Sequence, residues 1–241
     1  MERLEWLKHI REETEVLYDR FSPLYWVEFG FYPNETHLEY LQKFLGLIQK
    51  GGAVLSAACG AGRYDGILLE AGHSVIGIDQ SAGMLSRARE RFPQVRYEKM
   101  GLQEMHFREE FEGVICMDAM EHICPEDWPG IVSGFQKALK PGGVLYFTLE
   151  LAEEDLAASY ERAREQGLPV VFGELADEIE AAYEQIKALG QQPVPGEIAG
   201  KAAYHYYPSP EQVRAWLGQA GLLVEAEGTG NGYRHFIARK R

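Results

Sequence analysis

Small residues and one acid mark a segment that could hold a ligand, Val54 to Asp79. Within it, Cys59-Gly60-Ala61-Gly62 follows an apolar run and opens a helix-like stretch, and Asp79 ends the next apolar run. Small residues let the backbone approach a ligand closely, and the amides at a helix start favour negative charge. A carboxylate at the neighbouring strand end can accept both hydroxyls of a ribose. We interpret the segment as a nucleoside site; the alternative is a tight glycine turn beside a helix-capping acid.

Residues that could move a proton follow a later apolar run. Asp118, Glu121 and His122 come directly after Val114–Met117. His122 is the first candidate for a general base, because imidazole titrates near neutral pH. The alternative is that the Glu-His pair packs the loop that follows a strand.

Tyrosines and histidines near the end of the chain form a third group. Tyr233 and His235 are two residues apart on a predicted strand, so their side chains lie on one face of it. If that strand is antiparallel to the others, it begins at the sheet end where the nucleoside site lies. His205, Tyr206 and Tyr207 approach the same end. Tyr233 and His235 are therefore candidate catalytic residues, with edge packing as the alternative. A cluster of tyrosines and histidines suits an aromatic or amphipathic ligand, or an amine held against the tyrosine rings.

The elements that must position these groups alternate along the chain. Helix-like segments separate the first apolar runs, and the turn KPGG precedes the fifth. Strand, helix and strand in repetition predict an α/β fold with a parallel sheet and helices on both faces. The turn GTGNG predicts a terminal hairpin, and hence an antiparallel last strand. The predicted strands are 53–57, 75–78, 95–97, 114–117, 144–149, 222–227 and 233–239.

Two segments lie outside this alternation. Residues 4–20 have the periodicity of an amphipathic helix and precede an aromatic stretch, and Thr36 is placed to cap a second helix. Residues 151–205 contain two acidic, Ala-rich helix candidates, Glu153–Gln166 and Glu174–Leu189. The predicted regions are an N-terminal helical lid (1–50), a ligand-binding domain (51–150 and 206–241) and a helical insertion that covers the pocket (151–205).

Composition limits the partners of the chain. Its 241 residues carry a net charge of −13, and an acidic protein repels a phosphate backbone, so we expect no nucleic acid partner. No run approaches the ~20 apolar residues of a membrane span. The charged N-terminus also lacks the apolar stretch of a signal peptide. We expect a cytoplasmic protein that acts on a small molecule and binds no membrane.

The order and spacing of the motifs resemble those of the class I S-adenosylmethionine-dependent methyltransferases of the small-molecule type. The first motif of that family, acid-x-Gly-x-Gly-x-Gly, aligns with Ser56–Gly62, and IDQSAGML, FEGVICMDAMEHI and LKPGGVLYFTLE resemble later motifs. YDRFSPLY resembles a lid segment with two tyrosines over the cofactor. The resemblance covers roughly residues 15–150 and 204–241. It implies a Rossmann-like sheet of seven strands, mostly parallel, with an antiparallel last strand, an N-terminal lid and an insertion after the fifth strand.

The resemblance also implies a reaction and a set of contacts. S-adenosylmethionine would donate a methyl group to oxygen, nitrogen or carbon of a small-molecule acceptor, leaving S-adenosylhomocysteine. Asp79 falls on the ribose-binding acid of the family, Met84 lies near the adenine, and Arg63 is placed to pair with the methionyl carboxylate. The implied cofactor-binding residues are Tyr18, Tyr25, Ser56, Ala58, Cys59, Gly60, Gly62, Arg63, Asp79, Gln80, Met84, Gly101, Leu102, Gln103 and Met117.

Three alternatives remain open from the sequence. Ser56 and Ala58 stand where the family has an acid and a glycine, which allows a non-catalytic nucleoside-binding or scaffold protein. An NAD(P)-dependent Rossmann enzyme is less compatible, because its fingerprint is G-x-G-x-x-G and this chain has G-x-G-x-x-x-G. No metal is predicted, although Asp118-x-x-Glu121-His122 resembles a divalent-metal cluster of ubiquinone-pathway O-methyltransferases.

Overall fold

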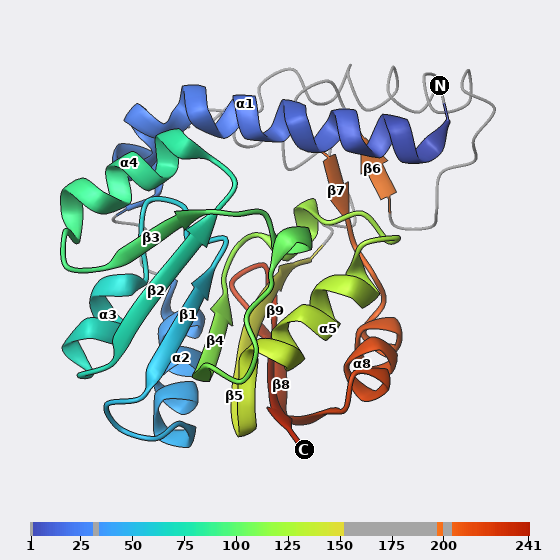
Figure 1. Cartoon of the computed structure of the whole chain (residues 1–241). Coiled ribbons are helices and arrows are strands. Elements are labelled where there is room, and N and C mark those ends of the chain that lie inside the picture. The colour runs from blue at the N-terminus through green and yellow to red at the C-terminus, as the bar shows by residue number, and fades with distance from the viewer. Residues whose placement is uncertain (1, 31–33, 152–196, 200–203) are drawn as a thin grey trace.

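A seven-stranded sheet forms the centre of the protein (Figure 1). The computed structural model describes residues 2–30, 34–151, 197–199 and 204–241. The strands follow the order β3-β2-β1-β4-β5-β9-β8. The first five are parallel, and β9 is antiparallel to both β5 and β8. The predicted sheet and its antiparallel last strand are confirmed. The bounds are β1 Ala53–Ala57, β2 Ser74–Asp79, β3 Arg96–Lys99, β4 Phe111–Cys116, β5 Leu139–Glu150, β8 Leu222–Gly230 and β9 Tyr233–Lys240.

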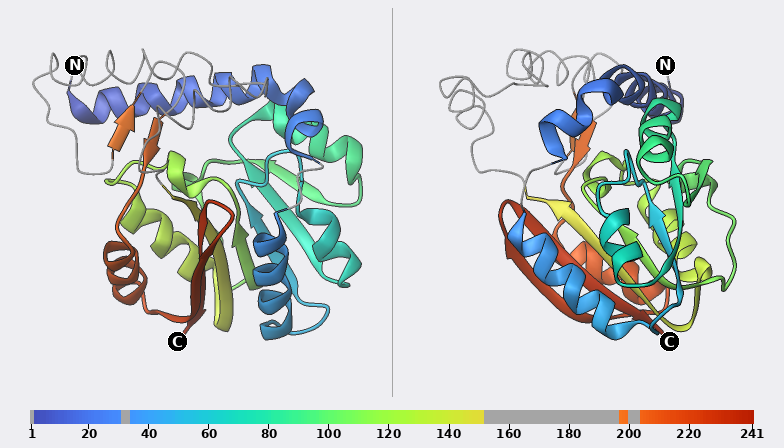
Figure 2. Two further views of the ribbon diagram at one scale, coloured as in Figure 1. Left: turned by 180° about the vertical axis from the view of Figure 1, so that it is seen from behind. Right: turned by 90° about the vertical axis from the view of Figure 1, so that its left-hand side faces the viewer.

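Helices cover both faces of this sheet (Figure 2). Apolar residues of α5 and α8 pack on one face, and those of α2, α3 and α4 pack on the other. The central strands β1, β4 and β5 are largely buried on both sides, which explains why they are nearly continuous apolar runs in the sequence. The helices are α1 Arg3–Phe29, α2 Glu35–Leu47, α3 Asp65–Glu70, α4 Ala82–Arg91, α5 Trp128–Ala138 and α8 Pro210–Gln219, with short 3-10 turns η1 Leu102–Glu104 and η2 Met120–His122.

Helix α1 is longer than the predicted helix over 4–20. It continues through Pro23 and ends at Phe29. Proline has no N–H to donate to the carbonyl four residues earlier, but the hydroxyl of Ser22 donates to that carbonyl, Asp19 O, at 2.9 Å. The local hydroxyl thus replaces the missing backbone hydrogen bond. The aromatic residues Phe21, Tyr25, Trp26 and Phe29 are therefore part of the helix.

Two predicted boundaries also differ from the structure. Asn34, not Thr36, caps α2, because its side-chain oxygen accepts the backbone N–H of His37 at 3.0 Å. The predicted turn at 140–143 lies inside β5, where the register with β4 shifts and Gly142 has a φ of 77°. The strand accommodates these residues as an irregularity, so its hydrogen bonds extend beyond the predicted turn.

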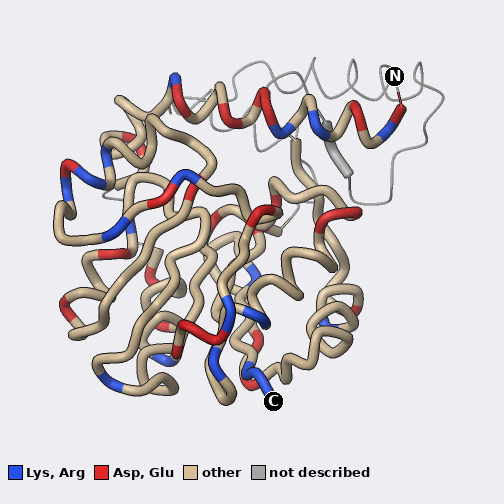
Figure 3. Tube along the Cα trace, in the orientation of Figure 1, with Lys and Arg blue, Asp and Glu red and all other residues tan. Residues whose placement is uncertain are grey.

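Helix α1 crosses the carboxyl ends of the parallel strands and runs beside α4 (Figure 1). Acidic and basic residues mix along it (Figure 3), and ion pairs join Arg11 to Asp127 and Glu15 to Lys99. Near its start, Trp6 packs against Tyr204. Tyr204 belongs to a small antiparallel pair, β6 Glu197–Ala199 and β7 Tyr204–Tyr206.

The two helices predicted for the insertion lie outside the described residues. Among the helices that the structure does describe, none combines the length and the apolar character needed to cross a bilayer.

Candidate active site

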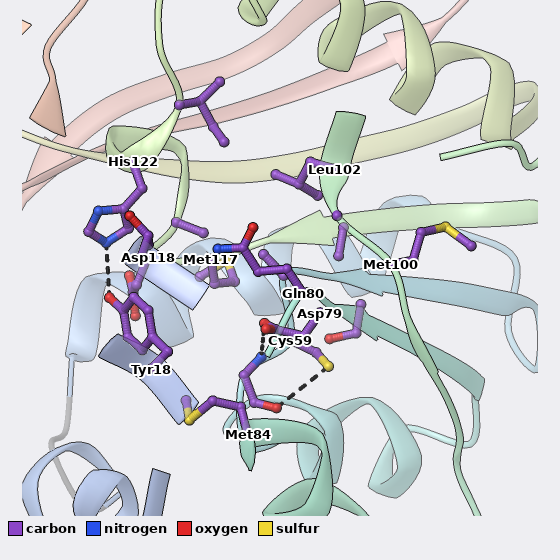
Figure 4. Close-up of a pocket in the computed structure, with 18 of the residues that line it drawn as sticks. Tyr18, Cys59, Asp79, Gln80, Met84, Met100, Leu102, Met117, Asp118 and His122 are labelled. Atoms are coloured by element: carbon purple, nitrogen blue, oxygen red, sulfur yellow. Dashed lines mark hydrogen bonds between the residues drawn. The ribbon is translucent and has the colours of Figure 1, made fainter. Parts of the chain in front are cut away.

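A pocket opens between α1 and the carboxyl ends of β1, β2 and β4 (Figure 4). It encloses about 1020 Å³, counting the part open to solvent, which is in the range of small-molecule sites. Fourteen of the fifteen residues predicted to bind the cofactor line it: Tyr18, Tyr25, Ser56, Ala58, Cys59, Gly60, Arg63, Asp79, Gln80, Met84, Gly101, Leu102, Gln103 and Met117.

The loop after β1 forms the floor of the pocket. Gly60 has a φ of 53°, and a Cβ atom added to it would lie 3.1 Å from Met84 Cε and 3.8 Å from the ring of Tyr25. Glycine therefore keeps the space above this backbone open. Ala58 is also left-handed, with a φ of 49°, which is a strained conformation for a residue with a Cβ.

Gly62 does not line the pocket. Its φ is 76°, and an added Cβ would lie 3.0 Å from the hydroxyl of Tyr97 and 3.1 Å from the carboxylate of Asp65. Those two side chains are hydrogen-bonded to each other at 2.6 Å below the loop. Gly62 thus serves the packing under the loop, and its proposed contact with a cofactor is not supported by this placement.

Asp79 combines the two roles that the sequence left open. Its Oδ2 accepts the backbone N–H of Gly60 at 2.9 Å, and its Oδ1 accepts that of Ser81 at 2.8 Å. It also lines the pocket (Figure 4). Burial raises the pKa of Asp79 to about 6, against the lowering effect of the two backbone hydrogen bonds. The carboxylate holds the loop and faces the pocket at the same time.

His122 lines the opposite end of the pocket, close to α1 (Figure 4). Its Nδ1 lies 3.2 Å from the carbonyl oxygen of Tyr204. Because a carbonyl only accepts, Nδ1 carries the proton, and Nε2 accepts from the hydroxyl of Tyr18 at 3.0 Å. Burial lowers the pKa of His122. The ring is therefore neutral at pH 7, with its basic nitrogen on the pocket side.

Asp118 is the most heavily hydrogen-bonded acid in the pocket wall. Its Oδ1 accepts from His37 Nε2 at 2.6 Å and from Thr148 Oγ1 at 3.3 Å. Its Oδ2 accepts from Tyr64 at 2.8 Å and from Arg63 at 3.1 Å. Burial alone would raise its pKa, but these partners hold the pKa of Asp118 below its usual value. A carboxylate has about four acceptor positions, so this one is saturated by the protein.

That saturation bears on the metal-like spacing of Asp118, Glu121 and His122. Glu121 is buried and does not line the pocket. Across the described parts of the chain, His, Cys, Asp and Glu side chains form no group of three placed to hold a metal ion. The three residues are neighbours in sequence, but Asp118 and His122 bind different partners and Glu121 is buried outside the pocket.

Tyr233 and His235, predicted as catalytic, are not among the residues that line this pocket. His235 is fully buried, stacks on Tyr40 with ring centroids 4.5 Å apart, and shares a hydrogen bond of 3.1 Å with Tyr146. Tyr233 packs edge-on against His37. The strand carrying them is antiparallel, as predicted, but these side chains enter an aromatic cluster behind Asp118. A catalytic role for either stays a prediction that this placement does not support.

Part of the pocket wall was missed from the sequence. Arg11 and Thr14 line it together with Tyr18 and Tyr25. Spacings of three, four and seven residues put these four side chains on one face of α1, and that periodicity is the signal that could have found them. The other lining residues that the sequence analysis did not name are Ala57, Tyr64, Met100, Ile115, Ala119 and Ile123, whereas Asp118 was among its candidates for chemistry.

Comparison with known proteins gives a consistent result. Residues 54–143 match a family model described as a methyltransferase domain. An uncharacterized methyltransferase of Synechocystis sp. is 35% identical over 98 residues, which is 40% of this chain and 46% of that protein. A ubiquinone biosynthesis O-methyltransferase of Hydrogenovibrio crunogenus is 26% identical over 93% of this chain and 85% of its own length. The chain spans about half the length of most of the curated relatives that it matches.

A solved structure extends the likeness to the whole fold. The 1,6-didemethyltoxoflavin-N1-methyltransferase of Burkholderia thailandensis, with bound 1,6-didemethyltoxoflavin and S-adenosylhomocysteine, superposes with a TM-score of 0.62 at 18% identity. The superposition covers 95% of this chain and 89% of that one. At this identity the likeness concerns the fold.

Proposed function

Because this chain belongs to the class I S-adenosylmethionine-dependent methyltransferases, we propose that it binds S-adenosylmethionine and methylates a small-molecule acceptor. The observation that carries the proposal is the pocket at the ends of β1, β2 and β4, with an acid at the end of β2 and a glycine floor. This is where an open parallel sheet binds its ligand. Family membership contradicts the nicotinamide alternative.

The proposed binding site for S-adenosylmethionine is supported by the hydrogen-bond acceptor positions that Asp79 has left. Each of its oxygens accepts one backbone N–H, and about two acceptor positions are left. Two ribose hydroxyls match that number. We assign the adenine to the wall made by Met84, Met100 and Leu102, and the methionyl end to the side of Arg63.

His122 is the base in this proposal. When bound, S-adenosylmethionine supplies a methyl group already activated on a sulfonium, and the acceptor gains a bond to carbon as the S–C bond breaks. The residues of the chain hold the partners close and exclude water. A hydroxyl or amine acceptor must also lose a proton, and Nε2 of His122 is unprotonated and faces the pocket. Burial lowers the pKa of this imidazole, so Nε2 carries no proton at neutral pH and is able to take one up.

The acceptor class rests on the chemistry of the wall and on named relatives. Tyr18, Tyr25, Tyr64 and His122 give the pocket several aromatic faces, which favour a flat or amphipathic acceptor. One relative is named for O-methylation in ubiquinone biosynthesis, and one structural neighbour for N1-methylation of a heterocycle. We therefore place the acceptor among small aromatic compounds methylated at oxygen or nitrogen, with carbon as the less supported atom.

The first experiment is isothermal titration with S-adenosylmethionine, S-adenosylhomocysteine and NADH. We expect micromolar binding of the first two and none of NADH. Binding of NADH alone would contradict the proposal. Binding of none of the three ligands, by protein free of co-purified ligand, would also contradict it and would favour a scaffold protein.

A second experiment tests the base. Once an acceptor is found by screening, His122→Asn should lower kcat about 10²-fold or more while donor affinity stays within a factor of three. Unchanged kcat would remove His122 as base.

A further inference from the structure

One carboxylate on α1 joins this helix to the start of α4. Oδ1 of Asp19 accepts the hydroxyl of Ser81 at 2.6 Å and the backbone N–H of Gly83 at 2.8 Å. Ser81 is the N-cap of α4, so Gly83 belongs to the first turn, where N–H groups have no partner within the helix. A negative charge is stabilised at such a helix start. Although burial opposes it, the hydrogen bonds from Ser81 and Gly83 lower the pKa of Asp19.

The fit of the two helices depends on a glycine at this contact. A Cβ atom added to Gly83 would lie 2.7 Å from Ser22 Oγ and 2.9 Å from the carbonyl oxygen of Asp19. The Ser22 hydroxyl can rotate away, but the backbone of Asp19 cannot, so the added Cβ would push α1 and α4 apart. At the other end of the contact, Arg91 of α4 lies over the ring of Trp26 of α1, 3.3 Å from its centroid. The two helices are thus held at both ends of α4.

The contact between α1 and α4 also holds two aromatic side chains over the pocket. Tyr18 precedes Asp19 and donates its hydroxyl to His122. Tyr25 follows two turns later, with its ring above the floor at Gly60. A shift of α1 on α4 would move both tyrosines away from the pocket together.

Ser81 connects the contact between α1 and α4 to Asp79 in the pocket wall. Its hydroxyl is bound by Asp19 of α1, and its backbone N–H is bound by Asp79 of β2. Ser81, which binds α1, is therefore also bound by Asp79, the carboxylate to which we assign the ribose. A displacement of Asp19 or of Asp79 therefore reaches the other carboxylate through one residue, Ser81.

We propose that Asp19 is a positioning residue, whose bond to the start of α4 keeps Tyr18 and Tyr25 over the donor site and thereby retains the donor. This inference rests on the proposed function, because it specifies how that site is closed. Donor affinity then depends on the fraction of molecules with α1 seated, since only those offer the complete pocket.

The test titrates S-adenosylhomocysteine into five chains: wild type, Asp19→Ala, Asp19→Asn, Gly83→Ala and Glu13→Gln. Asp19→Ala removes the acceptor, and Gly83→Ala displaces α1 by its added Cβ without changing charge. We expect each to weaken binding at least tenfold. Both contacts of Asp19 go to one oxygen, so the amide oxygen of Asn can reproduce them, and Asp19→Asn should recover binding to within about threefold of wild type. Glu13, an exposed acid of α1 whose carboxylate pairs with His9 one turn earlier, serves as the control, and Glu13→Gln should leave affinity unchanged.

Thermal unfolding without ligand separates positioning from simple loss of the fold. If Asp19→Ala and Gly83→Ala bind within threefold of wild type, the inference is overturned and the proposed function stands. If Asp19→Asn binds as poorly as Asp19→Ala, the hydrogen-bond account is also overturned. If wild type itself does not bind, the proposed function fails first, and the inference with it. The expected pattern is weakened binding by the Ala variants, recovery by Asn, and a cooperative unfolding transition in every chain.

Discussion

Two acids of the pocket wall differ in how much acceptor capacity the protein leaves them. Asp118 receives four hydrogen bonds from side chains, and its pKa is held below the usual value. Asp79 receives two from the backbone, and burial raises its pKa to about 6. A saturated carboxylate organises its neighbours, whereas an unsaturated one in a buried wall is suited to bind a ligand. This difference supports the proposed roles, with Asp118 as a structural acid and Asp79 as a ligand-binding one.

The raised pKa predicts how donor affinity depends on pH. Above pH 6 Asp79 is ionised and can accept two hydroxyls. As the pH falls through about 6 it takes up a proton and loses acceptor capacity, so affinity for S-adenosylhomocysteine should fall, by about tenfold between pH 7 and pH 5. Titration calorimetry from pH 5 to 8 measures this, and Asp79→Asn should bind weakly with no such slope. A slope that vanishes in His122→Asn instead would belong to the imidazole.

Residue types alone predicted most of the donor side of the site but little of the other side. The carboxyl ends of parallel strands meet at one edge of the sheet, so the motifs after β1, β2 and β4 had to converge. The partners of Asp118 come from α2, the loop after β1, and β5. No local pattern relates those segments. Tyr233 and His235 were placed on the correct strand, but alternation does not tell which cavity a strand face meets.

At the scale of elements, α1 shows how a side chain can preserve a helix that its sequence interrupts. Pro23 leaves the Asp19 carbonyl without its usual N–H partner, and the Ser22 hydroxyl takes that place. The helix therefore reaches Tyr25 and Phe29 in register. A pattern search treats proline as a probable boundary, which is why the predicted helix was too short.

Ser22→Ala tests this account through stability. The Asp19 carbonyl would lose its side-chain donor in a buried position, which should cost about 1 kcal/mol of unfolding free energy. Thr14→Ala is a matched control, because the Thr14 hydroxyl donates to Ile10 O at 2.9 Å in a regular stretch where the helix already supplies an N–H. Urea unfolding compares the two. If both variants lost the same unfolding free energy, the Ser22 hydroxyl would not be replacing the hydrogen bond that Pro23 cannot donate.

For the whole molecule, the pocket is a point where distant parts of the chain meet. Its wall combines α1, the ends of β1, β2 and β4, and the segment after β3, and His122 is tied to β7 through the Tyr204 carbonyl. A ligand that contacts all of these binds only the folded chain. Donor binding should therefore stabilise the protein as a unit rather than one region.

The size of that effect can be stated. At a free concentration 100 times its Kd, a ligand adds about 2.7 kcal/mol to the unfolding free energy. For a chain of this length, the melting temperature rises by about 2–4 °C per kcal/mol. S-adenosylhomocysteine should then raise Tm by about 5–10 °C, measured by calorimetry at a series of concentrations. A Tm independent of ligand, in protein that binds it by titration, would show that the pocket can form in partly unfolded chains.

The position of β9 between β5 and β8 also has a consequence for biosynthesis. Strand β5 pairs with residues 233–239, which lie 83 to 95 positions further along the chain than their partners. While a ribosome is still making that segment, β5 is paired only with β4 and has one unpaired edge, and β8 has no neighbour, because β9 is its only partner in the described sheet. Exposed strand edges invite pairing with other chains. We expect the nascent protein to complete its sheet only after residue 240 has emerged from the ribosome, and to depend on chaperones until then. An arrest-peptide assay that found full folding force before residue 240 emerged would contradict this.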